Sequence, residues 1–150
     1  MFSAAAGIVA ELRNAGFEAY IVGGAVRDLC LGKLPKDYDI TTNAVPAEIM
    51  KLFPRSIPLG ASFGVVTVVA DSMNFEVATF REERDYEDGR RPETLRFSKT
   101  PQEDVARRDF TINAMLLDPE KEILIDCTCV NEFIGIIPPI IFQGTQITKI

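Results

Sequence analysis

The chain has 150 residues, enough for one compact domain, and 47% of them are apolar, which suits a globular protein with a core. Its net charge of −6 counts against a protein whose main task is gripping nucleic acid phosphates, although it suits a cation site. The chain contains no histidine, which excludes Ser-His-Asp and Cys-His catalysis and leaves a zinc site almost without ligands.

The sequence carries no membrane or targeting signal. No apolar run approaches the roughly 20 residues that span a bilayer, so we expect no membrane partner. The opening segment Met1–Ala10 is apolar, but it lacks a basic start and continues into Glu11 and Arg13, which favours an amphipathic helix over a signal peptide. The three cysteines form no CxxC pair, so we expect reduced thiols and a cytoplasmic protein.

Three elements are expected near the start of the chain. Apolar residues recur at helical spacing over Ala4–Arg13, and Asn14–Gly16 supplies a helix-stop signal. A β-prone run, Glu18–Val22, then meets Gly23-Gly24, and Ala25–Leu31 has the pattern of a helix. The predicted order is therefore strand, glycine turn, helix.

The middle of the chain predicts more strands. A second short strand is expected over Asp37–Thr41, followed by a helix over Pro46–Phe53 that proline opens. Two β-rich runs, Gly64–Ala70 and Asn74–Phe80, are separated by the short polar pair Asp71-Ser72. That spacing predicts an antiparallel hairpin.

The last expected elements follow a charged segment. Arg81–Pro92 is dense in both charge signs and predicts a loop, and Pro101–Asn113 predicts a helix. Leu116–Asp118 and Glu122–Ile125 predict short strands on either side of a turn. The sum is a mixed α/β domain with a small twisted sheet and helices on one face.

The sharpest chemical feature combines Gly23-Gly24 with Asp37 and Asp39. Residues i and i+2 of a strand point to the same face, so the two aspartates would stand side by side while Tyr38 faces the core. Two carboxylates at this spacing suit Mg²⁺, which is usually held by one or two carboxylates plus substrate phosphates. The glycine pair lets backbone approach such phosphates closely. Each motif taken singly also fits an ordinary turn.

Three segments together resemble one family. Val22–Asp28, Asp37–Asp39 and Arg107–Ala114 are similar to the signatures of CCA-adding and bacterial poly(A)-adding enzymes, within the DNA polymerase β nucleotidyltransferase superfamily. The resemblance covers most of residues 20–126. It implies a palm-like nucleotidyltransferase fold, Mg²⁺ as cofactor, ATP and CTP as substrates, and the tRNA 3′ end as partner.

The resemblance also implies roles for individual residues. Asp37, Asp39 and Glu76 would be the catalytic metal ligands. The expected nucleotide-binding residues are Gly23, Gly24, Arg27, Arg108, Asp109 and Asn113. Two alternatives stay open from the residues alone, because Glu76 also fits an exposed strand glutamate and Arg107-Arg108-Asp109 also fits a solvated charge cluster. The segment Arg84–Pro92 resembles the family's flexible loop, and equally fits a mobile polar connection.

The sequence departs from the family beyond the head. The family carries a base-reading Glu-Asp-x-x-Arg helix after the head, and none follows Asn113 here. We therefore assign residues 1–126 to a nucleotidyltransferase head and 127–150 to a divergent tail. The function expected is template-independent addition of CMP and AMP to tRNA, with most tRNA contacts outside this chain. The alternatives are a poly(A) polymerase-type enzyme and a non-catalytic nucleotide-binding module.

Overall fold

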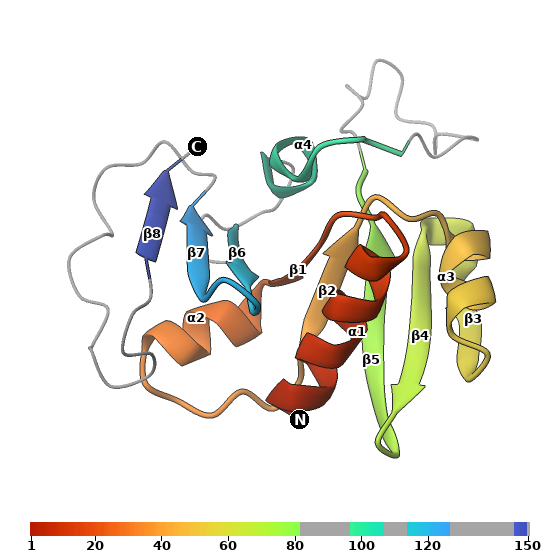
Figure 1. Ribbon diagram of the computed structural model, residues 1–150, viewed down its shortest axis with the longest axis horizontal. Helices are drawn as coiled ribbons and strands as arrows, with labels where there is room; N and C mark the ends of the chain where they lie inside the picture. The colour runs from red at the N-terminus through yellow and green to blue at the C-terminus, as the bar shows by residue number, and fades with distance from the viewer. Residues whose placement is uncertain (82–96, 107–113, 127–145, 150) are drawn as a thin grey trace, which may run out of the picture.

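The computed structural model describes residues 1–81, 97–106, 114–126 and 146–149 (Figure 1). The helices are α1 (Phe2–Asn14), α2 (Gly24–Cys30), α3 (Pro46–Leu52) and α4 (Pro101–Ala106), with a 3₁₀ turn, η1, over Ala61–Phe63. The strands are β1 (Ala19–Val22), β2 (Asp39–Thr42), β3 (Ser56–Gly60), β4 (Val65–Ala70), β5 (Met73–Thr79), β6 (Met115–Asp118), β7 (Ile123–Asp126) and β8 (Gln146–Lys149).

All described strands join one mixed sheet in the order β3-β4-β5-β2-β1-β6-β7-β8. The pairs β2–β5 and β7–β8 are parallel and the others are antiparallel. The parallel pair β2–β5 at the centre arises because α3 and the β3–β4 hairpin return the chain to the same end of the sheet. The expected mixed α/β class is confirmed.

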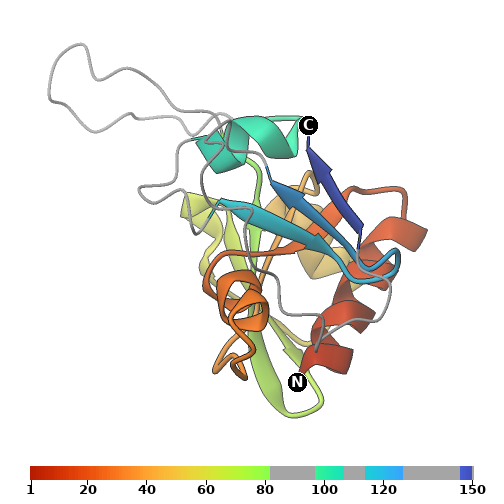
Figure 2. The same cartoon turned by 90° about the vertical axis from the view of Figure 1, so that its left-hand side faces the viewer.

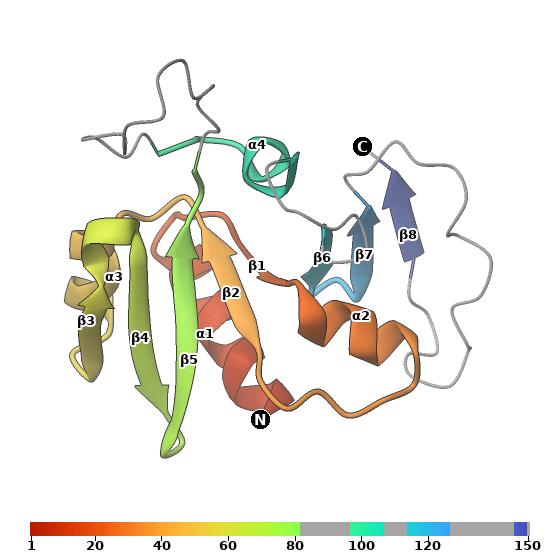
Figure 3. The same cartoon turned by 180° about the vertical axis from the view of Figure 1, so that it is seen from behind.

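The larger core lies on one face of the sheet. Apolar side chains of α1, α2 and α3 pack there in one cluster with buried residues of the central strands, such as Ile40, Phe75 and Val77. Seen from behind, β4, β5 and β2 lie in front of α1, so this helix covers the far side of the sheet (Figure 3). Burial in this cluster, and not helix propensity, is the main support for helices as short as α2 and α3.

The short helix α4 packs separately, over the other face. Its Val105 belongs to a second cluster with Val22 of β1, Leu116 of β6 and Ile125 of β7. The strand residues next to these, Ile21, Leu117 and Leu124, belong to the larger cluster, as side-chain alternation requires. Turning the molecule by 90° shows α4 beside the ends of β6 and β7 (Figure 2). The helical cover therefore lies mainly on one face, with α4 on the opposite one.

The predicted hairpin is present, and its turn has a defined conformation. Strands β4 and β5 pair from Val65↔Ala78 to Ala70↔Met73. Asp71 and Ser72 both have positive φ, 49° and 62°, as a two-residue type I′ turn requires. The polar pair seen in the sequence is therefore the turn itself.

Some boundaries differ from the sequence prediction. Strand β2 starts at Asp39, two residues later than predicted, because its pairing with β1 starts there, at Val22↔Asp39. Strands β3 and β8 were not predicted. β3 is an edge strand with largely exposed side chains and Pro58 inside it, and β8 depends on long-range pairing with β7. The predicted helix is described only as far as Ala106, and the predicted loop only at Arg81.

The chain on either side of residues 82–96 is held together at the sheet. Arg81 and Phe97 form an isolated antiparallel bridge, and the N–H of Ser98 donates to the carbonyl of Phe80 at 2.9 Å. The Phe97 ring lies directly on Gly64, where a Cβ would come within 2.8 Å of Phe97 Cε1. Only glycine fits at this position, which also has a φ of +77°.

In the described residues, no helix combines the length and the apolar character that crossing a membrane requires.

Candidate metal and nucleotide site

Asp39 stands between the glycine turn and Glu76. The antiparallel β1–β2 register pairs Val22 with Asp39, so Gly23 and Gly24 follow directly after the residue opposite Asp39. On the other side, the parallel β2–β5 register pairs Ile40 with Val77. Asp39 and Glu76 each precede one of these paired residues, so they are neighbours on adjacent strands. Segments far apart in sequence therefore meet on three adjacent strands, at the end of β1, the start of β2 and the middle of β5.

The two carboxylates share a face of the sheet. Asp39 and Glu76 are exposed, whereas Ile40 and Val77, next to them in sequence, are fully buried against the larger core. Neighbouring side chains of adjacent strands point the same way, so Asp39 and Glu76 project from the face opposite α1. Glu76 therefore points away from its buried neighbours Phe75 and Val77.

Asp37 lies just before the strand and keeps its alternation. Asp37 is exposed, and Tyr38 is buried at 5% exposure with its ring edge-on to Phe2, the centroids 6.0 Å apart. Burial raises the pKa of the Tyr38 hydroxyl. The expectation that Tyr38 faces the core between two outward aspartates therefore agrees with the structure, although only Asp39 belongs to β2.

The glycine turn has a backbone conformation that residues other than glycine rarely adopt. Gly23 has φ 79° and ψ −139°, a region open essentially to glycine alone, and it directly precedes α2. Its carbonyl accepts from the N–H groups of Val26 and Arg27, at 3.1 and 3.2 Å. The first N–H groups of a helix have no carbonyl within the helix to bond, so the start of α2 presents donors beside Asp39.

Arg27 lies over this turn and contacts a carboxylate. The Nη2 atom of Arg27 would be 3.5 Å from a Cβ built on Gly24. Its Nε and Nη2 donate to Oδ1 of Asp28 at 3.0 and 2.8 Å, with 36% of the arginine side chain and 26% of the aspartate side chain exposed. Arg27 is therefore paired with a carboxylate of the fold in this structure, and its assignment to nucleotide binding stays a prediction. A partly exposed ion pair of this kind contributes little to stability.

The donor set fits a divalent ion in its chemistry. Asp37, Asp39 and Glu76 are exposed carboxylates, and hard oxygen ligands of this kind suit Mg²⁺. Within the described ranges, however, no three Asp, Glu, Cys or His side chains lie close enough together to hold an ion. Carboxylates repel one another when no cation lies between them. The assignment of all three to one metal site stays a prediction.

The other predicted site residues lie outside the described ranges. Arg108, Asp109 and Asn113 fall within 107–113, and Arg84–Pro92 falls within 82–96. Their assignment to nucleotide binding also stays a prediction. Residues 107–113 follow directly after α4 in the sequence. Helix α4 packs over the face of the sheet that carries Asp39.

Sequence reasoning missed Asp104, which the structure places at the edge of this site. Asp104 is fully buried and accepts hydrogen bonds from Thr41 Oγ1 of β2 and from the backbone N–H of Arg81. Together with Glu103 and Arg107 it spells Glu-Asp-x-x-Arg, but a buried Asp104 cannot read a base edge. In the sequence it looks like an ordinary acidic residue in a first helical turn, so only its burial marks it.

The family is shown by comparison with known proteins. The model of the poly A polymerase head domain family matches residues 19–130 of this chain. The chain therefore belongs to the poly A polymerase head domain family. This result confirms the resemblance seen in the three sequence segments.

Individual relatives agree with the family. The chain is 50% identical over 125 residues to the CCA-adding enzyme of Geobacillus kaustophilus, covering 83% of this chain and 31% of that one. It is 48% identical over 117 residues to the CCA-adding enzyme of Geobacillus stearothermophilus, covering 78% and 29%. The chain thus spans about a third of the length of these curated relatives.

A solved structure supports the same fold. The Bacillus stearothermophilus CCA-adding enzyme in complex with CTP superposes with a TM-score of 0.69 at 37% identity, covering 84% of this chain and 33% of that one. The sheet and helices described here are therefore those of a nucleotidyltransferase head.

Proposed function

We propose that this chain is the catalytic head of a template-independent nucleotidyltransferase that adds CMP and AMP to the 3′ end of tRNA. The observation that carries the proposal is the register of β1, β2 and β5. Through Val22↔Asp39 and Ile40↔Val77, it brings the glycine turn, Asp39 and Glu76 together on one face. The relatives named CCA-adding enzymes and the neighbour solved with CTP support a nucleotide at such a site.

The reaction we propose is attack of an RNA 3′-hydroxyl on the α-phosphate of a nucleoside triphosphate, with pyrophosphate leaving. Asp37, Asp39 and Glu76 would hold Mg²⁺, which lowers the pKa of the attacking hydroxyl and neutralises charge on the leaving group. Gly23 and Gly24 allow the triphosphate to approach the backbone at the start of α2. Arg27 lies over that turn, where its planar guanidinium can bind phosphate oxygens in a bidentate way.

Within the family, CCA addition is favoured over poly(A) addition. The segment Gly60–Val66 resembles the version found in the tRNA enzymes. It runs from the end of β3 through η1 into β4, and glycine is needed at Gly64, whereas a side chain at Gly60 would be tightly packed. A Cβ on Gly60 would lie 3.0 Å from Cβ of Val65, and one on Gly64 would meet Phe97. The two glycines therefore suit close packing beside β4, and the preference for tRNA rests on the resemblance.

The test is nucleotide transfer by the chain itself. The chain is incubated with an RNA primer that has a free 3′-hydroxyl, Mg²⁺ and each labelled triphosphate in turn, and the extended primer is measured. Incorporation that requires Mg²⁺ and disappears in Asp39→Ala supports the proposal. Triphosphate binding without incorporation of any nucleotide would instead identify a non-catalytic nucleotide-binding module.

A further inference from the structure

A buried carboxylate joins three elements around the candidate site. Oδ2 of Asp104 in α4 accepts from Thr41 Oγ1 at 3.1 Å, and Oδ1 accepts from the backbone N–H of Arg81 at 3.2 Å. Both Asp104 and Thr41 have 0% exposure. A buried carboxylate is costly unless hydrogen bonds compensate it, so each of these donors matters to the stability of this contact.

Two hydrogen bonds of Asp104 lead away from its own helix. An acidic residue in a first helical turn commonly interacts with the free N–H groups of that turn. Asp104 reaches to the strand that carries Asp39 and to Arg81, the second residue after the end of β5, the strand that carries Glu76. It therefore connects α4 to both strands that present the predicted metal ligands.

The connection is made on the face of the candidate site. Thr41 is two residues after Asp39 in the same strand, so both side chains project from one face, about 6.6 Å apart along the strand. Thr42, the next residue, projects from the opposite face and donates to the carbonyl of Glu18 at 2.6 Å. Asp104 thus fixes where α4 begins to cover the sheet beside Asp39.

The predicted nucleotide contacts Arg108, Asp109 and Asn113 follow α4 in the sequence. We propose that Asp104 is a positioning residue: by bonding Thr41 and Arg81, it holds α4 over the face of the sheet that carries Asp39 and Glu76. This inference rests on the proposed function. It adds a residue that acts through α4 and does not itself touch substrate.

The test compares two neighbouring threonines of β2. Thr41→Val removes the hydroxyl that Asp104 binds, and Thr41→Ser keeps it. Thr42→Val is the matched control, because Thr42 is equally buried and hydrogen-bonded but faces away from Asp104. Asp104→Asn is the direct variant, since one oxygen and one NH₂ group cannot accept from both donors. The readouts are the affinity for ATP with Mg²⁺ and the free energy of unfolding.

Thr41→Val and Asp104→Asn should weaken ATP affinity about tenfold, a typical effect of one displaced charged contact. Thr41→Ser should leave the ATP affinity within about twofold of that of the parent. Thr42→Val should do the same, although it should lose about as much stability as Thr41→Val. If Thr41→Val and Thr42→Val change affinity equally, Asp104 is purely structural and the inference is overturned. If Asp104→Asn does not fold, the three threonine variants decide. A parent chain that binds no triphosphate overturns the proposed function and this inference together.

Discussion

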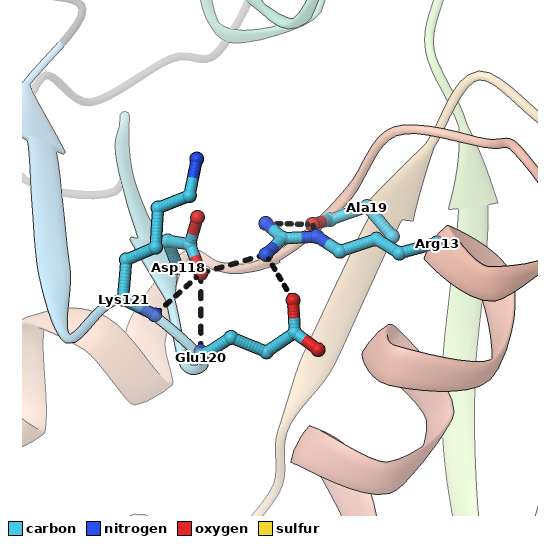
Figure 4. Close-up of polar contacts among 5 residues, drawn as sticks. All are labelled: Arg13, Ala19, Asp118, Glu120 and Lys121. Atoms are coloured by element: carbon cyan, nitrogen blue, oxygen red, sulfur yellow. Dashed lines mark hydrogen bonds and ion pairs between the residues drawn. The ribbon is translucent and has the colours of Figure 1, made fainter.

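Arg13, at the end of α1, is bonded to Asp118, at the end of β6, more than a hundred positions along the chain. Nη1 of Arg13 donates to Oδ1 of Asp118 at 2.7 Å, and its Nε and Nη2 donate to the carbonyl of Ala19 at 3.1 and 2.8 Å (Figure 4). Strands β1 and β6 pair only at Ile21↔Leu117 and Val22↔Leu116. The guanidinium therefore continues the link between these strands where their own pairing has ended.

We expect Arg13→Met to lower the free energy of unfolding by about 2–4 kcal/mol, because it leaves the 6%-exposed Asp118 carboxylate without its cation. Urea unfolding measures the change. Lys121→Ala is the control, since Lys121 contacts Asp118 through its backbone N–H, which the substitution retains. Equal effects of the two substitutions would mean that the Arg13 contact contributes nothing specific.

Asp118 should also give stability a dependence on pH at the acid side. Burial raises the pKa of this carboxyl, but hydrogen bonds from Arg13 and from the N–H groups of Lys121 and Glu120 outweigh burial and hold it below its ordinary value of 3.8. Such a group contributes stability above its unfolded pKa and loses it as the pH falls through the folded pKa.

The free energy of unfolding should therefore fall with pH below about pH 4, and Asp118→Asn should make this fall shallower. Urea unfolding at a series of pH values measures both slopes. Parallel curves for the parent and the variant between about pH 5 and pH 2.5 would show that Asp118 does not contribute to the acid dependence.

The sequence predicted the elements that carry their own pattern. The strand, glycine turn and helix around Gly23 follow from local residue types, and so does the hairpin at Asp71-Ser72. Strand β3 contains Pro58 and largely exposed side chains, and β8 forms through long-range pairing with β7, so neither could be found locally. For the site, the spacing of Asp37 and Asp39 indicated a shared face. The role of Asp104 depends on burial between distant elements, which no spacing reveals.

Asp39→Ala should abolish nucleotide transfer and leave the fold intact, because it removes a charged group from a site with three candidate ligands. Primer extension and thermal unfolding are the measurements. Glu11→Ala, an exposed acidic residue on α1, is the control and should transfer nucleotide at the parent rate. An Asp39→Ala protein with unchanged unfolding and more than about a tenth of the parent rate would count against Asp39 as a ligand, since a ligand should cost well over 1.4 kcal/mol.

Arg27→Lys should weaken triphosphate affinity while stability barely changes. Lysine keeps the charge and loses the planar fork, and the partly exposed pair with Asp28 contributes at most about 1 kcal/mol. Titration with ATP and urea unfolding separate the two effects. A loss of about 2 kcal/mol in stability with unchanged affinity would make Arg27 a structural partner of Asp28 alone.

The chain should bind ATP, CTP, GTP and UTP with similar affinities in the presence of Mg²⁺. By the proposed function, the glycine turn, Arg27 and Mg²⁺ would contact the parts that all triphosphates share, whereas base choice requires side chains that bond the base edge. No Glu-Asp-x-x-Arg signature follows Asn113. Equilibrium titration of the four nucleotides is the measurement. A preference of about a hundredfold for CTP and ATP, near 2.7 kcal/mol, would mean that this chain already contains a base-reading surface.

Backbone contacts of Arg81, Phe97 and Ser98 hold together, near the end of β5, the two points where the chain leaves and rejoins the sheet. Because the bridge and the bond from Ser98 to Phe80 fix both sides at one place, an insertion between them adds chain without moving a strand. Doubling such a segment costs only about 0.6 kcal/mol in closure entropy. The stability of the sheet should therefore depend little on the number of residues that join Arg81 to Phe97.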